Sequence, residues 1–292
     1  MDVQEAHADL LVGGIITSMR ILVTGAGGLI GSALVDVGGD PVIGLARGDL
    51  DITDPDAVHR TLQTLAPDAV INAAAQANVN LADREPERSF AVNGAAVAGL
   101  AEQCAERSIR LVHISTDYVL DDPDRELTED LPTNPRSTYA ITKLVGEQAA
   151  LAAGAVVVRV QWVYQPGARG FFNLALRRLA AGEPLSLVTD QIGRPTPATQ
   201  VARGLLLAAR GGPVGLFHLA CGGETSARNW ISTAAVLSGL PFDATPITRA
   251  ELGGAYRPAR SCLCSDRFAD AWGLRLPDWA VALRAVIRNV IE

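Results

Sequence analysis

The feature that most constrains this chain is a short apolar run followed by clustered glycines and then a helix-forming stretch. Residues 20–24 read Arg-Ile-Leu-Val-Thr and are typical of a buried strand. Three glycines follow at intervals of three residues, at Gly25, Gly28 and Gly31. Glycine permits a tight turn and lets the backbone approach a pyrophosphate, and a helix N-terminus offers unpaired N–H groups. The order of strand, glycine loop and helix therefore favours a dinucleotide-binding site over a turn that binds nothing.

Strands and helices alternate through the first half of the chain. Strand-like apolar runs are expected at 41–46, 68–75, 109–116 and 155–164, and helices at 54–67, 85–107 and 137–153. The helix that follows residue 53 has good end signals, with Asp54 as its cap and Pro55 in its first turn. The alternation predicts an α/β fold of the Rossmann type, with a doubly wound parallel sheet.

The alternation breaks after residue 164, where loops and a proline-punctuated extended stretch begin. We therefore expect a smaller substrate-binding lobe toward the C-terminus. The expected division is a nucleotide-binding domain over 19–160 with a return segment near 193–220, and a substrate lobe from 161–192 and 221–292. Residues 1–18 carry acidic residues but no lysine or arginine, unlike a signal peptide. They are interpreted as a flexible extension or an over-long start; a helix docked on a partner is the alternative.

Composition argues against several classes of function. The chain has 292 residues and a formal net charge of −7, so we expect no nucleic-acid partner. No run approaches the ~20 apolar residues of a membrane helix, so no membrane partner is expected either. The four cysteines show no zinc-type spacing, which predicts reduced thiols in a cytoplasmic protein and no metal site. A disulfide between Cys262 and Cys264 is the alternative.

A tyrosine and a lysine stand four residues apart at Tyr139 and Lys143, and Lys143 is the only lysine in the chain. Residues at i and i+4 share one helix face. A cation beside a phenol lowers the pKa of the phenol, which would help Tyr139 give a proton to a carbonyl under reduction. The ammonium could also bind the nicotinamide ribose. The alternative is an ordinary surface lysine. Either hydroxyl of Ser115 or Thr116, at the preceding strand end, could hold the substrate oxygen, or simply form a turn.

The end of the second predicted strand bears on the choice between NAD and NADP. An acidic residue there would bind the adenosine ribose hydroxyls, but the chain has Arg47. An arginine favours a 2′-phosphate, so we expect NADPH, with NADH as the alternative if Arg47 is merely solvated. Asp51 and Ile52 follow, where a loop could lie beside the adenine.

From about residue 20 to the C-terminus, the chain resembles the extended short-chain dehydrogenase/reductases and, within them, the dTDP-4-dehydrorhamnose reductase family. The segments that carry this resemblance are ILVTGAGGLIG (21–31), DITD (51–54), VINAAA (70–75), EPERSFAVN (85–93), VHISTDYVL (112–120), YAITKLVGE (139–147), WVY (162–164), DQIGRPT (190–196) and RPARSCL (257–263). The STDYV and DQ-x-G-x-PT segments together are specific to this family rather than to reductases in general.

The resemblance implies that Thr116, Tyr139 and Lys143 form the catalytic set, with hydride passing to a ketone of a dTDP-keto sugar or a related ketone. Beyond the residues already named, it implies cofactor contacts at Leu29, Ile30, Ala73, Ala74, Ala75, Asn93 and Ser115. It implies that substrate contacts fall at Gln76, Asn80, Asp117, Tyr118, Gln161, Trp162, Gln191, Thr196 and Arg257.

The expected substrate side departs from the family's usual residues. Where the family usually reads Tyr-Thr-x-Val-Asp-Lys-Ala-Glu, residues 76–83 read Gln-Ala-Asn-Val-Asn-Leu-Ala-Asp, and Gln161, Gln165 and Arg260 also differ. We therefore expect a sugar ketoreductase with an unusual substrate. A catalyst for a non-sugar natural product and a non-catalytic NADP-binding regulatory subunit are the alternatives. A homodimer is also considered.

Overall fold

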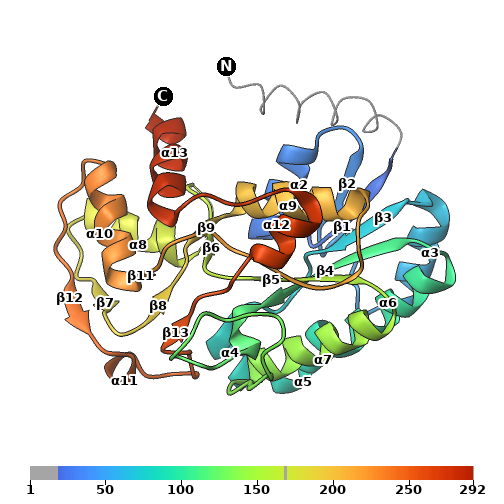
Figure 1. Cartoon of the computed structure of the whole chain (residues 1–292), viewed down its shortest axis with the longest axis horizontal. Helices are drawn as coiled ribbons and strands as arrows, with labels where there is room; N and C mark the ends of the chain where they lie inside the picture. Colours follow the sequence, from blue (N-terminus) through green and yellow to red (C-terminus); the bar gives the residue numbers. More distant parts are fainter. Residues whose placement is uncertain (1–18, 168–169, 292) are drawn as a thin grey trace.

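A computed structural model describes residues 19–167 and 170–291, so the expectation for residues 1–18 lies outside the described part of the chain. Its centre is a six-stranded parallel sheet in the order β10-β5-β4-β3-β1-β2 (Figure 1). The strands are β1 (Ile21–Thr24), β2 (Val42–Leu45), β3 (Ala69–Asn72), β4 (Arg110–Thr116), β5 (Val156–Val160) and β10 (Gly215–Leu219). The predicted α/β architecture with a doubly wound parallel sheet is confirmed.

Helices cover both faces of this sheet (Figure 1). One face carries α2 (Leu29–Gly38) and α9 (Ala198–Arg210), and the other carries α3 (Pro55–Leu65), α6 (Ala96–Glu106) and α7 (Thr138–Ala152). Successive strand residues point to opposite faces, so Val23 packs in the first core and Leu22 in the second. The Asp54 carboxylate caps α3 by accepting from the amides of Asp56 and Ala57, as predicted.

The prediction of a single helix over 85–107 is wrong in detail. The chain forms α5 (Pro86–Phe90), a π-helical turn η1 (Ala91–Ala95) and then α6, preceded by an unpredicted α4 (Val79–Arg84). The turn contains Asn93, whose side-chain amide bonds both the N–H and the carbonyl of Gln76 and also donates to the Thr142 hydroxyl. A widened turn of this kind is a common feature near functional sites.

The single strand expected over 155–164 is also wrong. Strand β5 ends at Val160, and β6 (Val163–Tyr164) leaves the sheet to pair with β9 (Thr196–Pro197). The break falls at Trp162, whose φ of 42° lies in the left-handed region that few side chains adopt. Both strands are largely buried, so the apolar pattern continues through the break and conceals it.

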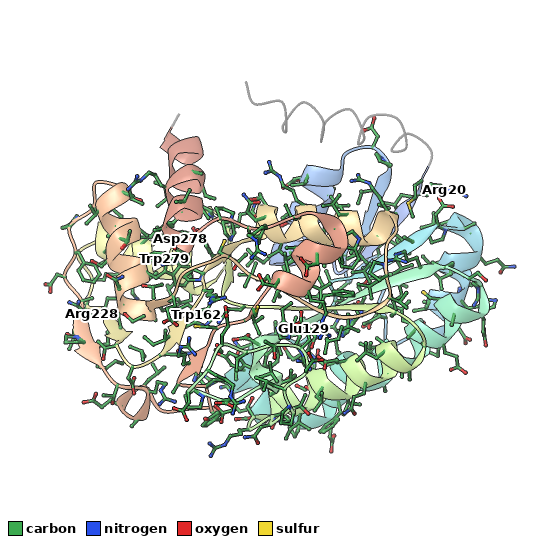
Figure 2. The ribbon with its side chains drawn as sticks, in the orientation of Figure 1. Arg20, Glu129, Trp162, Arg228, Asp278 and Trp279 are labelled. Carbon is green, nitrogen blue, oxygen red and sulfur yellow. The ribbon has the colours of Figure 1, made fainter. Side chains whose placement is uncertain are left out.

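The remaining segments form a smaller unit beside the sheet (Figure 1). Its helices are α8 (Phe171–Ala180), α10 (Ala227–Leu237), α11 (Arg249–Leu252) and α13 (Trp279–Ile291), while α12 (Asp266–Trp272) packs on β10. Short strands complete it, with β8 (Ile192–Gly193) between β11 (Thr225–Ser226) and β13 (Arg260–Ser261), and β7 (Ser186–Val188) paired with β12 (Thr245–Ile247). Trp162 lies where this unit meets the sheet (Figure 2). Among the described residues, no helix is long and apolar enough to cross a membrane.

Candidate active site

Three cavities that share lining residues follow the carboxyl edge of the sheet. The first, of about 440 Å³, contains eight of the predicted cofactor residues: Gly25, Gly28, Arg47, Asp51, Ile52, Ala73, Ala74 and Ala75. The sequence reasoning missed Gly27, Ala46, Gly48, Leu50, Arg88 and Val92, which line the same cavity. All of these except Arg88 are close in sequence to residues already predicted, and this proximity is the main signal that could have identified them. Arg88 reaches the cavity from α5.

The glycine loop approaches the end of β3 more closely than any side chain would allow. A Cβ atom on Gly25, where φ is +70°, would lie 2.6 Å from the Ala74 backbone, and one on Gly31 would lie 2.2 Å from the Gly25 carbonyl oxygen. The loop therefore requires glycine at both positions, and it leads directly into the N-terminus of α2. This arrangement suits a pyrophosphate, because backbone N–H groups and the helix dipole both favour an anion there.

Arg47 stands at the rim of the first cavity and pairs with Asp51. The Arg47 Nε and Asp51 Oδ2 atoms are 3.3 Å apart, and the Arg47 side chain is 67% exposed. Asp51 also accepts from the backbone and hydroxyl of Thr53, and these two bonds are the main reason its pKa is lowered. Arg47 is thus both solvated and available to a ligand at the rim.

The second cavity, of about 480 Å³, brings together the predicted catalytic residues Thr116, Tyr139 and Lys143. Ser137 caps α7 by accepting from the Ala140 N–H at 3.2 Å, and this start places Tyr139 and Lys143 one turn apart on the face toward the sheet. The cavity also contains the predicted residues Leu29, Ile30, Ser115, Asp117, Tyr118 and Trp162. It shares Gly28 and residues 73–75 with the first cavity.

Lys143 is almost completely buried. Its Nζ donates to the Ile114 carbonyl oxygen at 2.6 Å and lies 3.4 Å from His113 Nε2. Burial lowers the pKa of Lys143 to about 8, and the nearby Glu147 carboxylate opposes that shift. Lys143 is therefore not the solvated surface lysine of the alternative interpretation.

Tyr139 does not show the lowered pKa that the Tyr–Lys spacing predicted. Burial raises the pKa of Tyr139 to about 12, and the neighbouring Thr116 hydroxyl offsets only part of this shift. The prediction was wrong because desolvation of the phenolate, together with the nearby Asp117 carboxylate, raises the pKa more than the Thr116 hydroxyl lowers it. The edge of Tyr118 packs on the Tyr139 ring, with ring centroids 5.8 Å apart.

The two candidate hydroxyls have different partners. Ser115 donates to Glu147 Oε2 at 2.6 Å, and Glu147 in turn receives Arg159 Nε at 2.9 Å. Thr116 donates to Asp117 Oδ1 at 3.0 Å and also lowers the pKa of Tyr139. Thr116, rather than Ser115, is thus the hydroxyl that stands beside Tyr139.

Asp117 is a buried carboxylate without a cationic partner among the described residues. Its two oxygens accept from the Thr116 hydroxyl and, at 2.6 Å, from the Ser261 hydroxyl of β13. Burial raises the pKa of Asp117 to about 6 even though these hydroxyls favour the ionised form. The contact connects the end of β4 to the C-terminal part of the chain.

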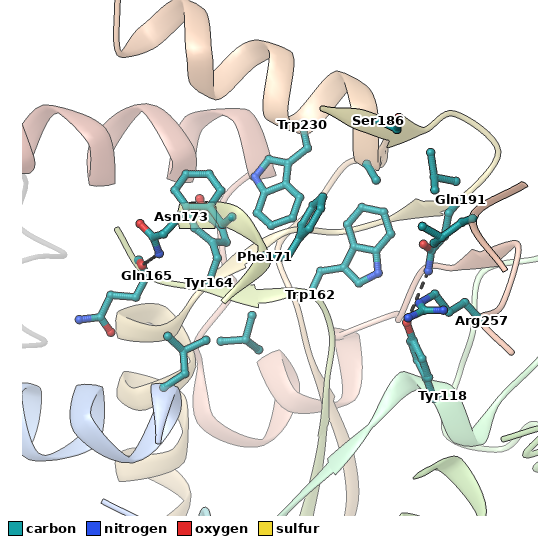
Figure 3. A pocket seen from close by; sticks show the side chains of 16 residues that line it. Tyr118, Trp162, Tyr164, Gln165, Phe171, Asn173, Ser186, Gln191, Trp230 and Arg257 are labelled. Carbon is teal, nitrogen blue, oxygen red and sulfur yellow. Dashed lines mark hydrogen bonds between the residues drawn. The ribbon is translucent and has the colours of Figure 1, made fainter. Parts of the chain in front are cut away.

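The third cavity, of about 360 Å³, shares Leu29 and Tyr118 with the second and extends into the smaller unit. Figure 3 shows the side chains that line it. Tyr118, Gln191 and Arg257, all predicted substrate residues, stand at one end, and Gln191 Nε2 lies 3.5 Å from the Tyr118 hydroxyl. The sequence reasoning missed an aromatic cluster in which Trp230 packs against Trp162, Tyr164, Phe171 and Phe172. Trp162 and Phe171 line both the second and third cavities.

Several predicted site residues line none of these three cavities, namely Gly31, Asn80, Asn93, Gln161 and Thr196. Gln161 is buried and bonds Ser261 and the Leu263 N–H, and Thr196 bonds the Arg194 carbonyl and the Cys221 N–H.

Asn80 and Gln76, both predicted to touch substrate, lie outside the second and third cavities. The Asn80 side-chain oxygen accepts from Ala255 and Arg257, and Gln76 lines the first cavity rather than the second.

The fold and this site together define an oxidoreductase of the short-chain dehydrogenase/reductase class. Residues 19–291 match the family described as RmlD substrate binding domain. A dTDP-4-dehydrorhamnose reductase of Mycolicibacterium smegmatis is 38% identical over 287 residues, covering 94% of this chain and 87% of the relative. This chain therefore belongs to the dTDP-4-dehydrorhamnose reductase family, as its motifs predicted.

Further relatives agree with this assignment. A dTDP-4-keto-6-deoxy-D-glucose reductase of Streptomyces niveus is 33% identical over 276 residues, covering 90% of this chain and 95% of the relative. The crystal structure of a Bacillus anthracis dTDP-4-dehydrorhamnose reductase in complex with NADP superimposes with a TM-score of 0.87 at 25% identity, covering 93% of this chain and 99% of that one.

Proposed function

We propose that this chain reduces the ketone of a dTDP-linked deoxysugar with NADPH. The observation that carries the proposal is the order of the three cavities. The glycine-loop cavity suits a dinucleotide, the aromatic cavity suits a second nucleotide, and the cavity between them holds Thr116, Tyr139 and Lys143. The names of the relatives from Mycolicibacterium smegmatis and Streptomyces niveus support the substrate class.

In this mechanism the bound NADPH supplies the hydride, and the residues of this chain handle the proton and the geometry. Tyr139 donates its phenolic proton to the ketone oxygen as that oxygen becomes an alkoxide. Its pKa of about 12 keeps the phenol protonated at neutral pH, as a proton donor must be. Thr116 orients the same oxygen, and the Lys143 ammonium stabilises the phenolate left behind.

Arg47 is the proposed contact of the 2′-phosphate that distinguishes NADPH from NADH. It is exposed at the rim of the first cavity and is held there by Asp51. A guanidinium suits a phosphate because it offers a planar, bidentate set of donors. The NADP bound to the Bacillus anthracis relative supports this choice of cofactor.

Arg257 is the proposed contact of the substrate diphosphate. It lines the third cavity, and within the described part of the chain its guanidinium donates only to the neutral oxygens of Ala255 and Asn80, at 2.9 and 3.3 Å. Among the described residues it forms no ion pair, so its charge remains available to an anionic ligand. The rings of Trp162, Phe171 and Trp230 then offer apolar faces to a nucleobase.

The decisive experiment follows the loss of NADPH absorbance with a panel of dTDP-4-keto sugars, including dTDP-4-dehydro-6-deoxy-L-mannose. Tyr139→Phe should lower kcat by about 10²–10⁴-fold, because it removes the general acid. NADPH affinity should change little in this variant. If NADPH binds but no sugar ketone is turned over, the substrate belongs to another class. Arg47→Ala should weaken NADPH binding about tenfold and leave NADH binding unchanged, because only NADPH carries the 2′-phosphate.

We further propose that the protein forms a homodimer in the cytoplasm. The exposed side chains of Phe90, Ile141 and Val145 on the adjacent helices α5 and α7 support an apolar contact with a second copy. The four free cysteines support a reducing compartment. Light scattering of the wild type and of Ile141→Asp tests this proposal. The wild type should have the mass of a dimer and the variant the mass of a monomer.

A further inference from the structure

A row of buried polar side chains crosses the sheet beneath α7. Thr24, Asn72 and His113 stand at paired positions of β1, β3 and β4, so their side chains lie on the same face of three neighbouring strands. All three are at most 1% exposed. The row ends against Lys143, whose Nζ lies 3.4 Å from His113 Nε2.

Hydrogen bonds determine which nitrogen of His113 carries the proton. The backbone N–H of Ala74 donates to Asn72 Oδ1 at 3.2 Å, and a backbone N–H can only donate, so that side-chain atom must be the oxygen. The amide nitrogen of Asn72 therefore faces His113 Nδ1, at 3.2 Å. Because an amide nitrogen is a donor, Nδ1 must accept, and the proton of the neutral imidazole resides on Nε2.

This tautomer directs an N–H group at the nitrogen of Lys143. An ammonium also presents only N–H groups, so the two donors oppose each other while Lys143 is charged. A neutral amine would instead accept from His113 Nε2. The Ile114 carbonyl, 2.6 Å from Nζ, stabilises the charged form. Glu147, one turn further along α7, also favours the charged form, although its carboxylate is already shared between Ser115 and Arg159.

We propose that His113 is a positioning residue that sets the charge of Lys143. Asn72 holds His113 in the Nε2–H tautomer, and this N–H group makes Lys143 lose its proton at the alkaline end of the pH range in which the enzyme works. The rate of reduction falls as Lys143 loses its proton. The inference rests on the proposed function, because Lys143 must be charged to support Tyr139. Burial keeps the pKa of His113 well below its usual value, so the imidazole is neutral throughout this range.

The tautomer can be tested directly on the full-length chain, without substrate, by nitrogen NMR of labelled imidazoles. The chain has four histidines, so assignment by single substitutions is practical. We expect His113 to show a protonated Nε2 and an unprotonated Nδ1, together with a shift of its signals as Lys143 titrates. Lys143→Met should abolish that shift. A protonated Nδ1, or signals that do not respond to Lys143, would overturn the proposal.

The consequence for catalysis is tested by the pH profile of kcat. In His113→Gln the side-chain amide is free to turn its oxygen toward Nζ, so the alkaline limb should move upward by about one pH unit, a tenfold change in Lys143 acidity. Thr24→Val removes a hydroxyl from the same row but leaves the Ala74 N–H to orient Asn72. The alkaline limb of its pH profile should therefore stay in place. Equal shifts in both variants, or none in His113→Gln, would contradict the proposal. Failure to turn over any dTDP-sugar would reject the proposed function alone, since the NMR result does not depend on it.

Discussion

The two faces of the central sheet differ sharply at the carboxyl ends of the strands. On the face under α2 and α9, apolar residues such as Val23, Ile71 and Val158 continue toward those ends. On the face under α7, the strands begin with Leu22, Val70, Leu111 and Val157 and then change to Thr24, Asn72, His113, Ser115 and Arg159. Buried polarity is thus concentrated where α7 holds Tyr139 and Lys143.

This difference shows where the fold buries polar groups at a cost in folding free energy. Burying polar and charged groups costs free energy unless each finds a partner, and a buried ion pair rarely improves on well-packed apolar residues. The face under α7 accepts that cost across four strands, whereas the face under α9 supplies apolar packing. Substitutions matched across the two faces should therefore have unequal effects.

The largest contrast is expected between Arg159→Met and Val158→Ala, adjacent residues that point to opposite faces. Arg159→Met leaves the Glu147 carboxylate buried without its ion pair and should lower the free energy of unfolding by about 3–5 kcal/mol. Val158→Ala removes only apolar contacts and should cost about 1–3 kcal/mol. Urea unfolding measures both. A loss in Arg159→Met no larger than that in Val158→Ala would mean that the ion pair is replaceable by apolar packing.

A second contrast uses two helical glycines, one on each side of the sheet. A Cβ on Gly146 of α7 would lie 2.1 Å from the Asn93 carbonyl oxygen, a rigid backbone atom. A Cβ on Gly204 of α9 would lie 2.4 Å from a Leu219 methyl, which is the end of a side chain rather than backbone, and 3.2 Å from the Phe268 ring. Gly146→Ala should therefore cost about 3 kcal/mol, because overpacking forces backbone shifts.

The same substitution should also lower kcat, since it displaces the helix that carries Tyr139 and Lys143. Gly204→Ala should cost less stability than Gly146→Ala, because a side-chain methyl can shift where a backbone oxygen cannot and alanine has a higher helix propensity than glycine, and it should leave kcat nearly unchanged. Thermal unfolding and steady-state kinetics of the two variants test the pair. Similar losses in both would show that α7 tolerates movement as well as α9 does.

The smallest effect concerns the pH dependence that Asp117 confers. Because burial raises its pKa from 3.8 to about 6, the folded state binds a proton more tightly than the unfolded state. The stabilisation from this group is complete below about pH 4 and is lost as the pH rises through about 6. Relative to Asp117→Asn, the wild type should lose about 2 kcal/mol of unfolding free energy between pH 4 and pH 7. Denaturant unfolding at several pH values measures this, with the exposed Asp124→Asn as a control that should run parallel to the wild type.

The parts of the site that could be predicted are those formed by residues close together in the sequence. Gly25 and Gly31 belong to one turn, and Tyr139 and Lys143 to one helix, so spacing alone places them. The elements of the parallel sheet were predictable for the same reason, since each depends on a local apolar pattern. The Asp54 cap is another case, because its partners are two and three residues away.

The parts that escaped prediction depend on contacts between distant segments. Phe171 and Trp230 meet in one aromatic cluster although α8 and α10 lie far apart in sequence, and each helix has the pattern of an ordinary core element. Gln161 directly precedes the WVY motif, yet its side chain turns toward Ser261. The raised pKa of Tyr139 likewise depends on burial, which no spacing rule reports.

The break at Trp162 has a consequence for how relatives of this enzyme can diverge. The Trp162 ring leaves so little room that a Cβ on Gly193 would lie 2.6 Å from it, and the ring borders both the catalytic and the aromatic cavity. Under the proposed function, a replacement there should alter both recognition of the nucleotide and placement of the ketone. New sugar preferences should therefore arise in evolution from the helices around the ring, where a change can adjust one compartment and leave the chemistry of the other intact.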